Sequence, residues 1–267
     1  MRRVTWSAIA VLLISTSVWA GDAPKATSSG QELRVGIATN YPPFAFKQGG
    51  HLTGIEPQFA KNLGHALGAK IQIVETPWDE LIPALRDHRI DVIMSGMSIT
   101  EARKQQVSFT DPYLRVGQMG LIRKTDDQRI PRLDAKSVTG KRVGVVGDTT
   151  GDQYARANLS TATIKAFDSV DSGVAALRKG EIDVFVHDAP AIWRVTGGFD
   201  SPERQLIGRF KPLTEEYLAW AVRQDDEALR TQLNTVLGRW KANGQLNAVL
   251  DHWIRVRKME ISTKPVH

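Results

Sequence analysis

An internal duplication constrains the fold of this chain more than any other feature of its sequence. Residues 33–37 read LRVGI, and residues 141–145 read KRVGV. The pattern Ala-Leu-Arg, three residues, then Ile-Asp-Val occurs at 84–92 and again at 176–184. Each match is short, but the two occur in the same order and each reads as the same structural part. The sequence therefore predicts two copies of one folding unit.

Each copy reads as alternating strands and helices. The Arg-Val-Gly segments are short β-branched runs typical of buried strands, and the Ala-Leu-Arg segments end helices that lead into a second such strand. Between them, Ile55, Phe59, Leu63 and Leu67 recur at helical spacing, and Gly68 stands where a helix would end. The order β-α-β-α-β indicates an α/β fold in which each unit is a parallel sheet with covering helices.

The C-terminal part of the chain has no counterpart in the duplication. Residues 216–222 read as a strand, residues 225–240 as a long amphipathic helix, and residues 246–253 as a last helix after a break at Gly244. We expect this tail to pack on the first unit.

The chain would then cross twice between the units, near 115–118 and near 212–217, and two crossings form a hinge. The predicted organisation is a signal peptide at 1–20, lobe one at 21–115 with 217–260, and lobe two at 116–216.

The N-terminus has the pattern of an export signal. Arg2 and Arg3 precede a mainly apolar stretch at 6–18, and small residues flank a cleavage site near Ala20. The apolar stretch is too short for a comfortable membrane span. We expect a soluble, exported product that begins near Gly21.

Composition excludes several classes of function. The chain of 267 residues has no cysteine, which excludes disulfides, cysteine-based zinc sites, thiol nucleophiles and a lipid-modified cysteine. The formal net charge of +6 is dispersed along the chain, without a basic run interleaved with aromatic residues. This charge pattern favours a solvated surface over nucleic-acid binding.

Four loops follow the predicted parallel strands, at 39–44, 95–100, 147–151 and 187–190. Ligands of open parallel sheets bind beyond the carboxyl ends of the strands. Two of these loops come from each unit, so we expect them to face one another across a cleft.

The loops offer charges that match a small zwitterion. Arg103 lies in the first turn of a helix that Thr100 is placed to cap, and a guanidinium matches a carboxylate in two-pronged geometry. Thr149 and Thr150 precede a helix whose free N–H groups suit an anion. Asp188 supplies the opposite charge, which an ammonium group needs.

Each of these residues also has a plainer interpretation. Arg103 could pair with Glu101 on the surface, Asp188 could be only a helix cap, and Thr149 and Thr150 are good caps whatever the function. Their convergence on strand-end loops of duplicated units favours a binding site.

Three aromatic residues near the loops, Tyr41, Phe44 and Trp78, offer flat apolar faces to a ligand, although aromatic residues are more often part of a core. His187 adjoins the Asp188 loop, but no second histidine lies at ligand spacing. We therefore expect neither a metal site nor a cofactor.

The segment 95–113, SGMSITEARKQQVSFTDPY, closely resembles the signature of periplasmic polar amino-acid-binding proteins of ABC importers. Supporting matches are at 41–44, 54–60, 81–85, 140–144 and 188–191. The resemblance covers nearly all of residues 31–257.

This resemblance implies a two-lobed periplasmic binding-protein fold of type II that closes on a hinge. It implies that Arg103 holds the α-carboxylate of an amino acid, with backbone N–H groups near Ser98 and Thr150, and that Asp188 and the Gly96 carbonyl hold the α-ammonium. Tyr41 and Trp78 would sandwich the ligand side chain. The candidate ligand-binding residues are Tyr41, Phe44, Trp78, Ser95, Gly96, Ser98, Arg103, Thr149, Thr150 and Asp188.

The implied partners are an amino acid and a membrane ABC permease, and the implied protein is a periplasmic monomer without catalytic activity. One departure is Asp148, where the family usually has glycine, and an acid there could weaken or reorient carboxylate binding. His187 could likewise adjust the pocket.

Two alternatives stay open. Cyclohexadienyl dehydratases resemble this family, and residues 112–117 are similar to theirs, but their general acid, a glutamate three residues after the aspartate that matches Asp188, is Ala191 here. The chain could instead be the ligand-sensing partner of a receptor. The sequence leaves the ligand side chain open among apolar, aromatic and cationic types, the last through cation–π contact.

Overall fold

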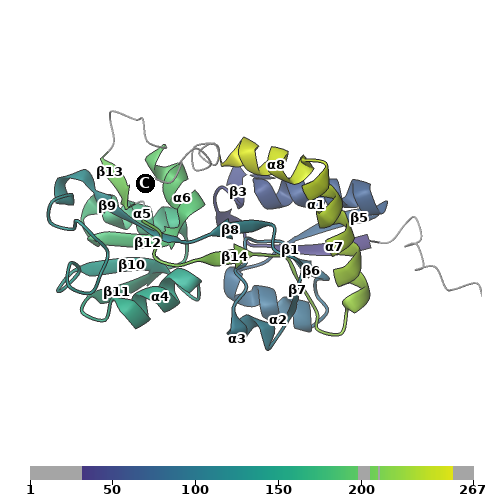
Figure 1. Ribbon diagram of the computed structural model, residues 1–267, viewed down its shortest axis with the longest axis horizontal. Helices are drawn as coiled ribbons and strands as arrows, with labels where there is room; N and C mark the ends of the chain where they lie inside the picture. Colours follow the sequence, from purple (N-terminus) through teal and green to yellow (C-terminus); the bar gives the residue numbers. More distant parts are fainter. Residues whose placement is uncertain (1–31, 198–204, 210, 255–267) are drawn as a thin grey trace, which may run out of the picture.

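The computed structural model describes residues 32–197, 205–209 and 211–254. The expected export signal, its cleavage near Ala20 and the leader at 21–31 lie outside the described residues. Figure 1 shows two lobes side by side, joined by a narrow pair of strands. In the part of the chain that the structure describes, no helix is both long and apolar enough to span a membrane.

Lobe one is built on a five-stranded sheet with the order β5-β1-β6-β15-β7. Its strands are β1 (Glu32–Ile37), β5 (Lys70–Glu75), β6 (Val92–Ile93), β7 (Ser108–Phe109) and β15 (Ala221–Val222). Strand β1 lies between β5 and β6 and is parallel to both, whereas β15 is antiparallel to its neighbours. A second small sheet contains β2 (Asn40–Tyr41), β3 (Ala45–Gln48) and β4 (His51–Thr53).

Lobe two repeats this arrangement with the order β11-β10-β12-β9-β13. Its strands are β9 (Gln118–Arg123), β10 (Arg142–Val146), β11 (Thr163–Phe167), β12 (Val184–Asp188) and β13 (Leu206–Arg209). Strand β10 is parallel to β11 and β12, and β9 runs antiparallel beside β12. The predicted duplication and α/β class are therefore confirmed, and the likeness extends to a fourth, antiparallel strand.

The residues that reveal the repeat in the sequence form the same ion pair in both lobes. Arg34 donates from its backbone N and its Nε to Asp91 Oδ2 at 3.0 Å, and from Nη2 to Oδ1 at 2.7 Å. Arg142 makes the same three hydrogen bonds to Asp183, at 2.9, 3.0 and 2.8 Å. Each pair joins the start of the central strand to the segment before the next strand, so it fixes the two strands in register.

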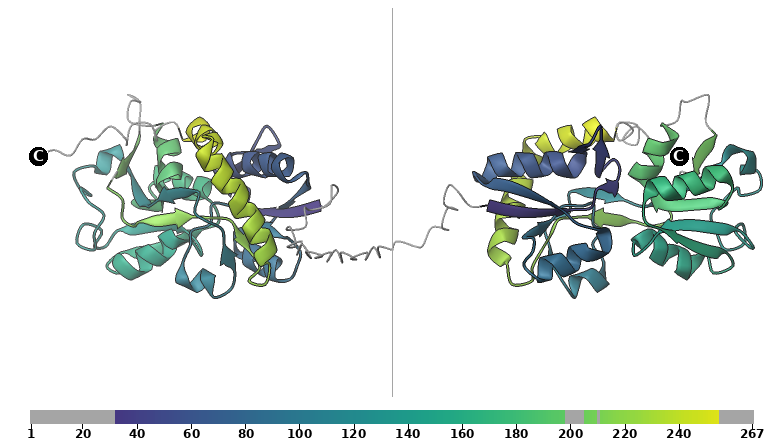
Figure 2. Two further views of the ribbon diagram at one scale, coloured as in Figure 1. Left: turned by 45° about the vertical axis from the view of Figure 1, so that its right-hand side comes forward. Right: turned by 180° about the vertical axis from the view of Figure 1, so that it is seen from behind.

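The helices cover both faces of each sheet (Figure 2). They are α1 (Ile55–Leu67), α2 (Leu81–Arg86), α3 (Glu101–Lys104), α4 (Thr150–Asn158), α5 (Val170–Lys179), α6 (Ala189–Thr196), α7 (Glu227–Ala242) and α8 (Gln245–Trp253), with 3-10 turns η1 (Trp78–Glu80) and η2 (Lys124–Asp126). Gly68 ends α1 in the left-handed conformation with φ of 63°, as its position in the sequence predicts.

The tail packs on lobe one, as expected. Trp240 of α7 stacks on Phe59 of α1 with ring centroids 5.7 Å apart, and Trp253 Nε1 of α8 donates to Gln58 Oε1 at 2.8 Å. The buried Trp240 and the partly buried Trp253 therefore anchor the end of the described chain to the first helix.

The expected single strand at 216–222 is wrong in one respect, because the structure divides it between two sheets. β14 (Glu216–Leu218) pairs antiparallel with β8 (Leu114–Val116), and β15 then joins the sheet of lobe one between β6 and β7. The chain changes partners at Ala219 and Trp220, since the strand that pairs with its first part lies outside the main sheet. β8 and β14 are the two segments that connect the lobes.

Candidate ligand-binding site

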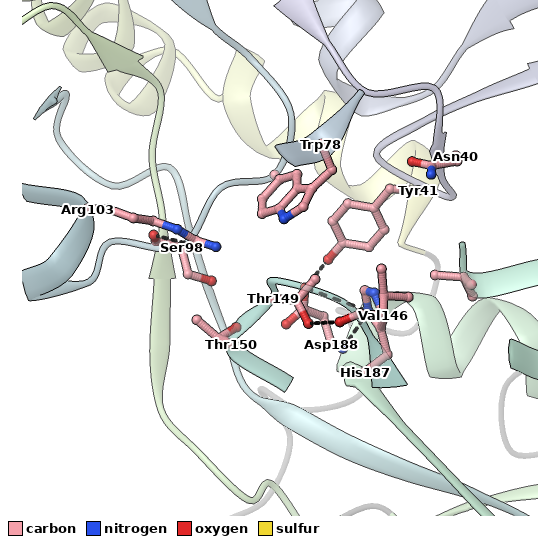
Figure 3. A pocket seen from close by; sticks show the side chains of 12 residues that line it. Asn40, Tyr41, Trp78, Ser98, Arg103, Val146, Thr149, Thr150, His187 and Asp188 are labelled. Carbon is pink, nitrogen blue, oxygen red and sulfur yellow. Dashed lines mark hydrogen bonds and ion pairs between the residues drawn. The ribbon is translucent and has the colours of Figure 1, made fainter. Parts of the chain in front are cut away.

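A cavity lies between the lobes, at the carboxyl ends of their central strands (Figure 3). It encloses about 420 Å³ of space, part of which is open to solvent. Its lining residues are Asn40, Tyr41, Trp78, Gly96, Ser98, Arg103, Val146, Thr149, Thr150, Val170, His187 and Asp188. Eight of the ten predicted site residues are among them, from loops of both lobes.

Arg103 supplies a fixed cation from lobe one. Thr100 caps α3 and accepts a hydrogen bond from the Arg103 backbone N at 3.2 Å, which sets where the side chain starts. The guanidinium donates to the carbonyl oxygens of Ser98 at 3.0 Å and Asp148 at 3.3 Å. Burial lowers the pKa of Arg103 below its ordinary value, yet a guanidinium keeps its proton at neutral pH.

The plainer interpretation of Arg103 as a surface partner of Glu101 is wrong. Only 8% of Arg103 is exposed, and among the described residues it forms no salt bridge. Lys104 is the residue that pairs with Glu101, with Nζ 2.8 Å from Oε1. The Arg103 charge is thus free of an acidic partner and faces the cavity.

Asp188 supplies the opposite charge from lobe two. It stands at the first position before α6, but its side chain makes no capping hydrogen bond. Its carboxylate instead accepts hydrogen bonds from the Tyr41 hydroxyl and from Gln118 Nε2. Burial, and secondly the charge of Glu216, raise the pKa of Asp188 to about 7. An anion in this position gains from a cation brought beside it.

The start of α4 adds hydrogen-bond groups to the same wall. Thr149 caps the helix, accepting from Asp152 N at 3.3 Å while its hydroxyl donates to the Val146 carbonyl at 2.8 Å. Thr150 Oγ1 accepts from Gln118 Nε2 at 3.1 Å. The first turn of a nine-residue helix presents N–H groups and a positive dipole end, both of which attract an anion.

Contacts across the cleft show that the lobes are closed on each other. Trp78 Nε1 and Arg103 Nη2, both from lobe one, donate to the carbonyl oxygen of Asp148. Asn40 Nδ2 donates to the carbonyl oxygen of Asp168 at 2.7 Å. Asp148 has φ of 58°, in the left-handed region that favours glycine and that aspartate tolerates better than most residues. Its backbone therefore meets lobe one, while its side chain is exposed.

Two predicted site residues, Phe44 and Ser95, do not line the cavity. Phe44 is fully buried, and its ring lies 4.7 Å from that of Tyr41, which it supports from behind. Ser95 Oγ accepts from Ala38 N at 3.0 Å and so holds two strand-end loops together. Both residues belong to the loops that the sequence identifies, but they face the core.

A buried acid beneath the lobe-one loop escaped the sequence analysis. Glu56 of α1 accepts from Gly96 N at 2.8 Å, from the Tyr113 hydroxyl at 2.5 Å and from Trp220 Nε1 at 3.1 Å. Burial raises its pKa to about 7, against the opposing effect of these hydrogen bonds. Glu56 fixes Gly96 in its left-handed conformation (φ 63°), which directs the loop toward the cavity.

Two polar residues on or beside the strands that connect the lobes, Gln118 and Glu216, were also not predicted from the sequence. Gln118 Nε2 donates to Asp188, Thr150 and Glu216, and Glu216 accepts from the Ser98 hydroxyl at 2.7 Å. These hydrogen bonds link the two lobes at the floor of the cleft. The only sequence signal is a polar residue at the start of a strand, which is too common to single them out.

Fold and site together define a class: a two-lobed binding protein that encloses a small ligand between α/β lobes joined by a pair of strands. The sequence profile of the bacterial extracellular solute-binding proteins, family 3, matches residues 33–256. The chain belongs to this family.

Individual relatives agree with this assignment. The L-cystine-binding protein TcyJ of Escherichia coli K12 is 28% identical over 222 residues, which are 83% of this chain and 82% of the relative. The L-arginine-binding protein of Pseudomonas aeruginosa is 29% identical over 256 residues, with coverage of 92% and 93%. The crystal structure of an ancestral amino acid-binding protein, a precursor of cyclohexadienyl dehydratase, superposes with a TM-score of 0.76 at 32% identity, covering 84% of this chain and 95% of that one.

Proposed function

We propose that this protein captures one amino acid between its lobes in the periplasm and delivers it to an ABC permease, without catalysing a reaction on it. The observation that carries the proposal is that Arg103 and Asp188, which belong to different lobes, line the same cavity. A buried cation and a buried anion on facing walls are complementary to an α-carboxylate and an α-ammonium group.

The expected sequence of binding follows from which lobe carries each group. The open protein would present Arg103 and Trp78 on lobe one, where the carboxylate docks first. Closure would then bring Asp188, Thr149 and Thr150 of lobe two onto the ligand and exclude water, which strengthens both charge interactions. The ligand stabilises the closed form only through its greater affinity for that form, so the contacts from lobe two drive closure.

The names of the two relatives support an amino acid as ligand. They are named for L-cystine and L-arginine, which differ in their side chains and share the α-carboxylate and α-ammonium. The groups that these two ligands share are the ones for which Arg103 and Asp188 are suited.

A dehydratase activity is the alternative function, because the ancestral protein that superposes on this chain is a precursor of cyclohexadienyl dehydratase. The position where the sequence comparison expects its general acid is Ala191, which is buried in α6. Asp188 is the only acidic residue among the described residues that line the cavity, and it already accepts two hydrogen bonds. We therefore propose binding without turnover, and an assay for loss of prephenate would test it.

The central experiment is a thermal-shift screen of the protein against the common amino acids, followed by calorimetry on the best ligand. A tight ligand raises the melting temperature by mass action. The same ligand with its carboxylate converted to an amide, or its amine acetylated, should each bind at least about 100-fold more weakly, since a buried charge would lose its partner. Binding that tolerates both blocked forms would contradict the proposal, as would no binding by any amino acid.

A further inference from the structure

The cavity lining divides into two parts when the charged ends of an amino acid are assigned. Gly96, Ser98, Arg103, Thr149, Thr150 and Asp188 carry the charges and backbone groups that suit the α-carboxylate and α-ammonium. The remaining lining residues form what we name the side-chain subsite: Asn40, Tyr41, Trp78, Val146, Val170 and His187. Figure 3 shows Arg103 and Ser98 at one end of the cavity, and Asn40, Val146 and His187 toward the other.

The walls of this subsite are apolar over much of their area. Val146 and Val170 are buried at 8% and 1% exposure, and both belong to lobe two. Tyr41 and Trp78 contribute aromatic rings from lobe one. Such walls favour hydrocarbon or aromatic parts of a ligand, because their contact removes apolar surface from water.

The two polar members of the subsite are uncharged. Asn40 is an amide, with both donor and acceptor capacity. His187 is buried, and its Nδ1 accepts a hydrogen bond from Asp188 N at 2.8 Å, so the neutral ring carries its proton on Nε2. Burial lowers the pKa of His187 to about 4, which keeps the ring neutral at physiological pH.

A cationic ligand side chain would be repelled by Arg103 and would find no acid of its own in this subsite, because Asp188 is assigned to the α-ammonium group. The guanidinium of Arg103 already lies over the Trp78 ring, 5.1 Å from its centroid, so that face is taken by a cation. The nearest further acid in the network, Glu216, is not among the lining residues. Its oxygens accept from Ser98, Thr214 and Gln118, at 2.7, 2.6 and 3.1 Å.

An anionic ligand side chain would also lack a counter-charge in this subsite. None of the six subsite residues is a lysine or an arginine, and Asp188 lies beside His187 in the same wall. Because Arg103 is assigned to the α-carboxylate, a second carboxylate here would be buried without a cation of its own, which is unfavourable.

We propose that the side-chain subsite selects amino acids with uncharged side chains, apolar or neutral polar, and discriminates against lysine, arginine and glutamate. This proposal rests on the proposed function, because it assumes that Arg103 and Asp188 hold the two ends of the ligand. Asn40 and His187 are the groups that can meet a neutral polar side chain, and Val146 and Val170 shape the apolar part.

Calorimetry with pairs of ligands of nearly equal shape tests the charge directly. The pairs are glutamine with glutamate, citrulline with arginine, and norleucine with lysine. In every pair of which either member binds, we expect the neutral member to bind at least about tenfold more tightly, since the charged member would be desolvated without a partner. Equal or tighter binding of lysine, arginine or glutamate would overturn this proposal and leave the proposed function intact. Failure of all amino acids to bind would instead overturn the proposed function.

A variant of the subsite provides the second measurement. Val146→Asp places an anion among the uncharged residues of the subsite, and it should reverse the norleucine preference so that lysine binds more tightly. Val146→Asn has the same shape without the charge, and it should keep the neutral preference. Circular dichroism melts establish that both variants fold, and the wild-type ligand pairs decide the question if Val146→Asp does not. An Asp variant that folds and still prefers norleucine would contradict the assignment of Val146 to the subsite.

Discussion

In lobe one the chain leaves its third parallel strand, β6, through a loop and reaches Arg103 in the short helix α3. In lobe two it leaves the equivalent strand, β12, at Asp188 and enters α6 at once. The two sheets have the same strand order and the same Arg–Asp pair, formed by Arg34 with Asp91 and by Arg142 with Asp183. The same strand arrangement is thus followed by a cation, Arg103, after β6 in lobe one and by an anion, Asp188, at the end of β12 in lobe two.

The supporting elements differ as well. Lobe one has the aromatic cluster of Phe59, Trp220 and Trp240, contributed in part by the tail, and it holds its loop in place with buried Glu56. Lobe two holds Asp188 with Gln118 and with Tyr41, a residue of the other lobe. The lobe-one part of the site is therefore held by contacts within lobe one, whereas the lobe-two part is completed by contact with lobe one.

The largest effect should come from removing one of the opposite charges. We expect Arg103→Ala to weaken amino-acid binding at least about 100-fold, because the ligand carboxylate would be buried without a counter-charge. Asp188→Asn should weaken it by a similar factor through the ammonium. Titration calorimetry measures both losses.

The matched control for this prediction is Lys104→Ala. Lys104 is the next residue of α3, it is exposed, and its charge is paired with Glu101, so its loss should leave affinity unchanged. Near-normal binding by Arg103→Ala would contradict the proposal that the two lobes hold the ligand with opposite charges.

An intermediate effect should come from the Arg–Asp pairs that occur at the same place in both lobes. We expect Asp91→Asn and Asp183→Asn each to lower the free energy of unfolding by about 1–3 kcal/mol, because each carboxylate accepts charge-assisted hydrogen bonds from two arginines. The two losses should add within about 0.5 kcal/mol, since the sites lie in different lobes. Denaturant unfolding of the single and double variants tests this. Strong non-additivity would show that the ion pairs of the two lobes do not contribute independently to stability.

The pH dependence of stability provides a further test of the Arg142–Asp183 pair in lobe two. The hydrogen bond from Arg142 lowers the pKa of Asp183 from 3.8 to about 2. Because the folded-state pKa is depressed, the stabilisation is present above about pH 4 and is lost as the pH falls through 2. The difference in stability between wild type and Asp183→Asn should therefore shrink over that range. A difference that stays constant down to pH 2 would exclude an ionic origin.

The smallest effect should come from a contact that exists only when the lobes are closed. The guanidinium of Arg194 in α6 lies 4.9 Å from the ring centroid of Phe46 in β3, across the cleft. An exposed cation–π contact contributes about 0.5–1 kcal/mol, so Arg194→Ala should raise the ligand Kd about two- to fivefold, mainly through faster dissociation.

Arg156→Ala is the control for this contact. Arg156 is an exposed arginine of lobe two that pairs with Asp152 within its own helix. Stopped-flow dissociation should separate the two variants, and equal rates would show that the Arg194 contact does not hold the closed form.

Much of this molecule could be predicted from the sequence because the informative patterns are local. The 3.6-residue spacing of Ile55, Phe59 and Leu63, the glycine after α1 and the cap at Thr100 each depend on neighbours a few residues away. The rule that ligands bind at strand ends then led to Arg103 and Asp188, which the structure brings to one cavity.

The errors have a common origin in side-chain direction. Phe44 and Ser95 lie in correctly identified loops, but their side chains face the core, and a loop without a regular period gives no indication of which way a residue points. Gln118 and Glu216 lie at strand ends with no motif, so only their position beside Asp188 makes them significant.

The sequence by itself determined the repeated unit, its helices and strands, and the chemical types that the strand-end loops carry, because each of these follows from short-range sterics and hydrophobic period. Only the tertiary structure decided which of those groups meet. Tyr41 and Asp188 are 147 positions apart, and their hydrogen bond exists because two separately folded lobes close on each other. Contacts over such a separation depend on the packing of the whole chain, and no local pattern encodes them.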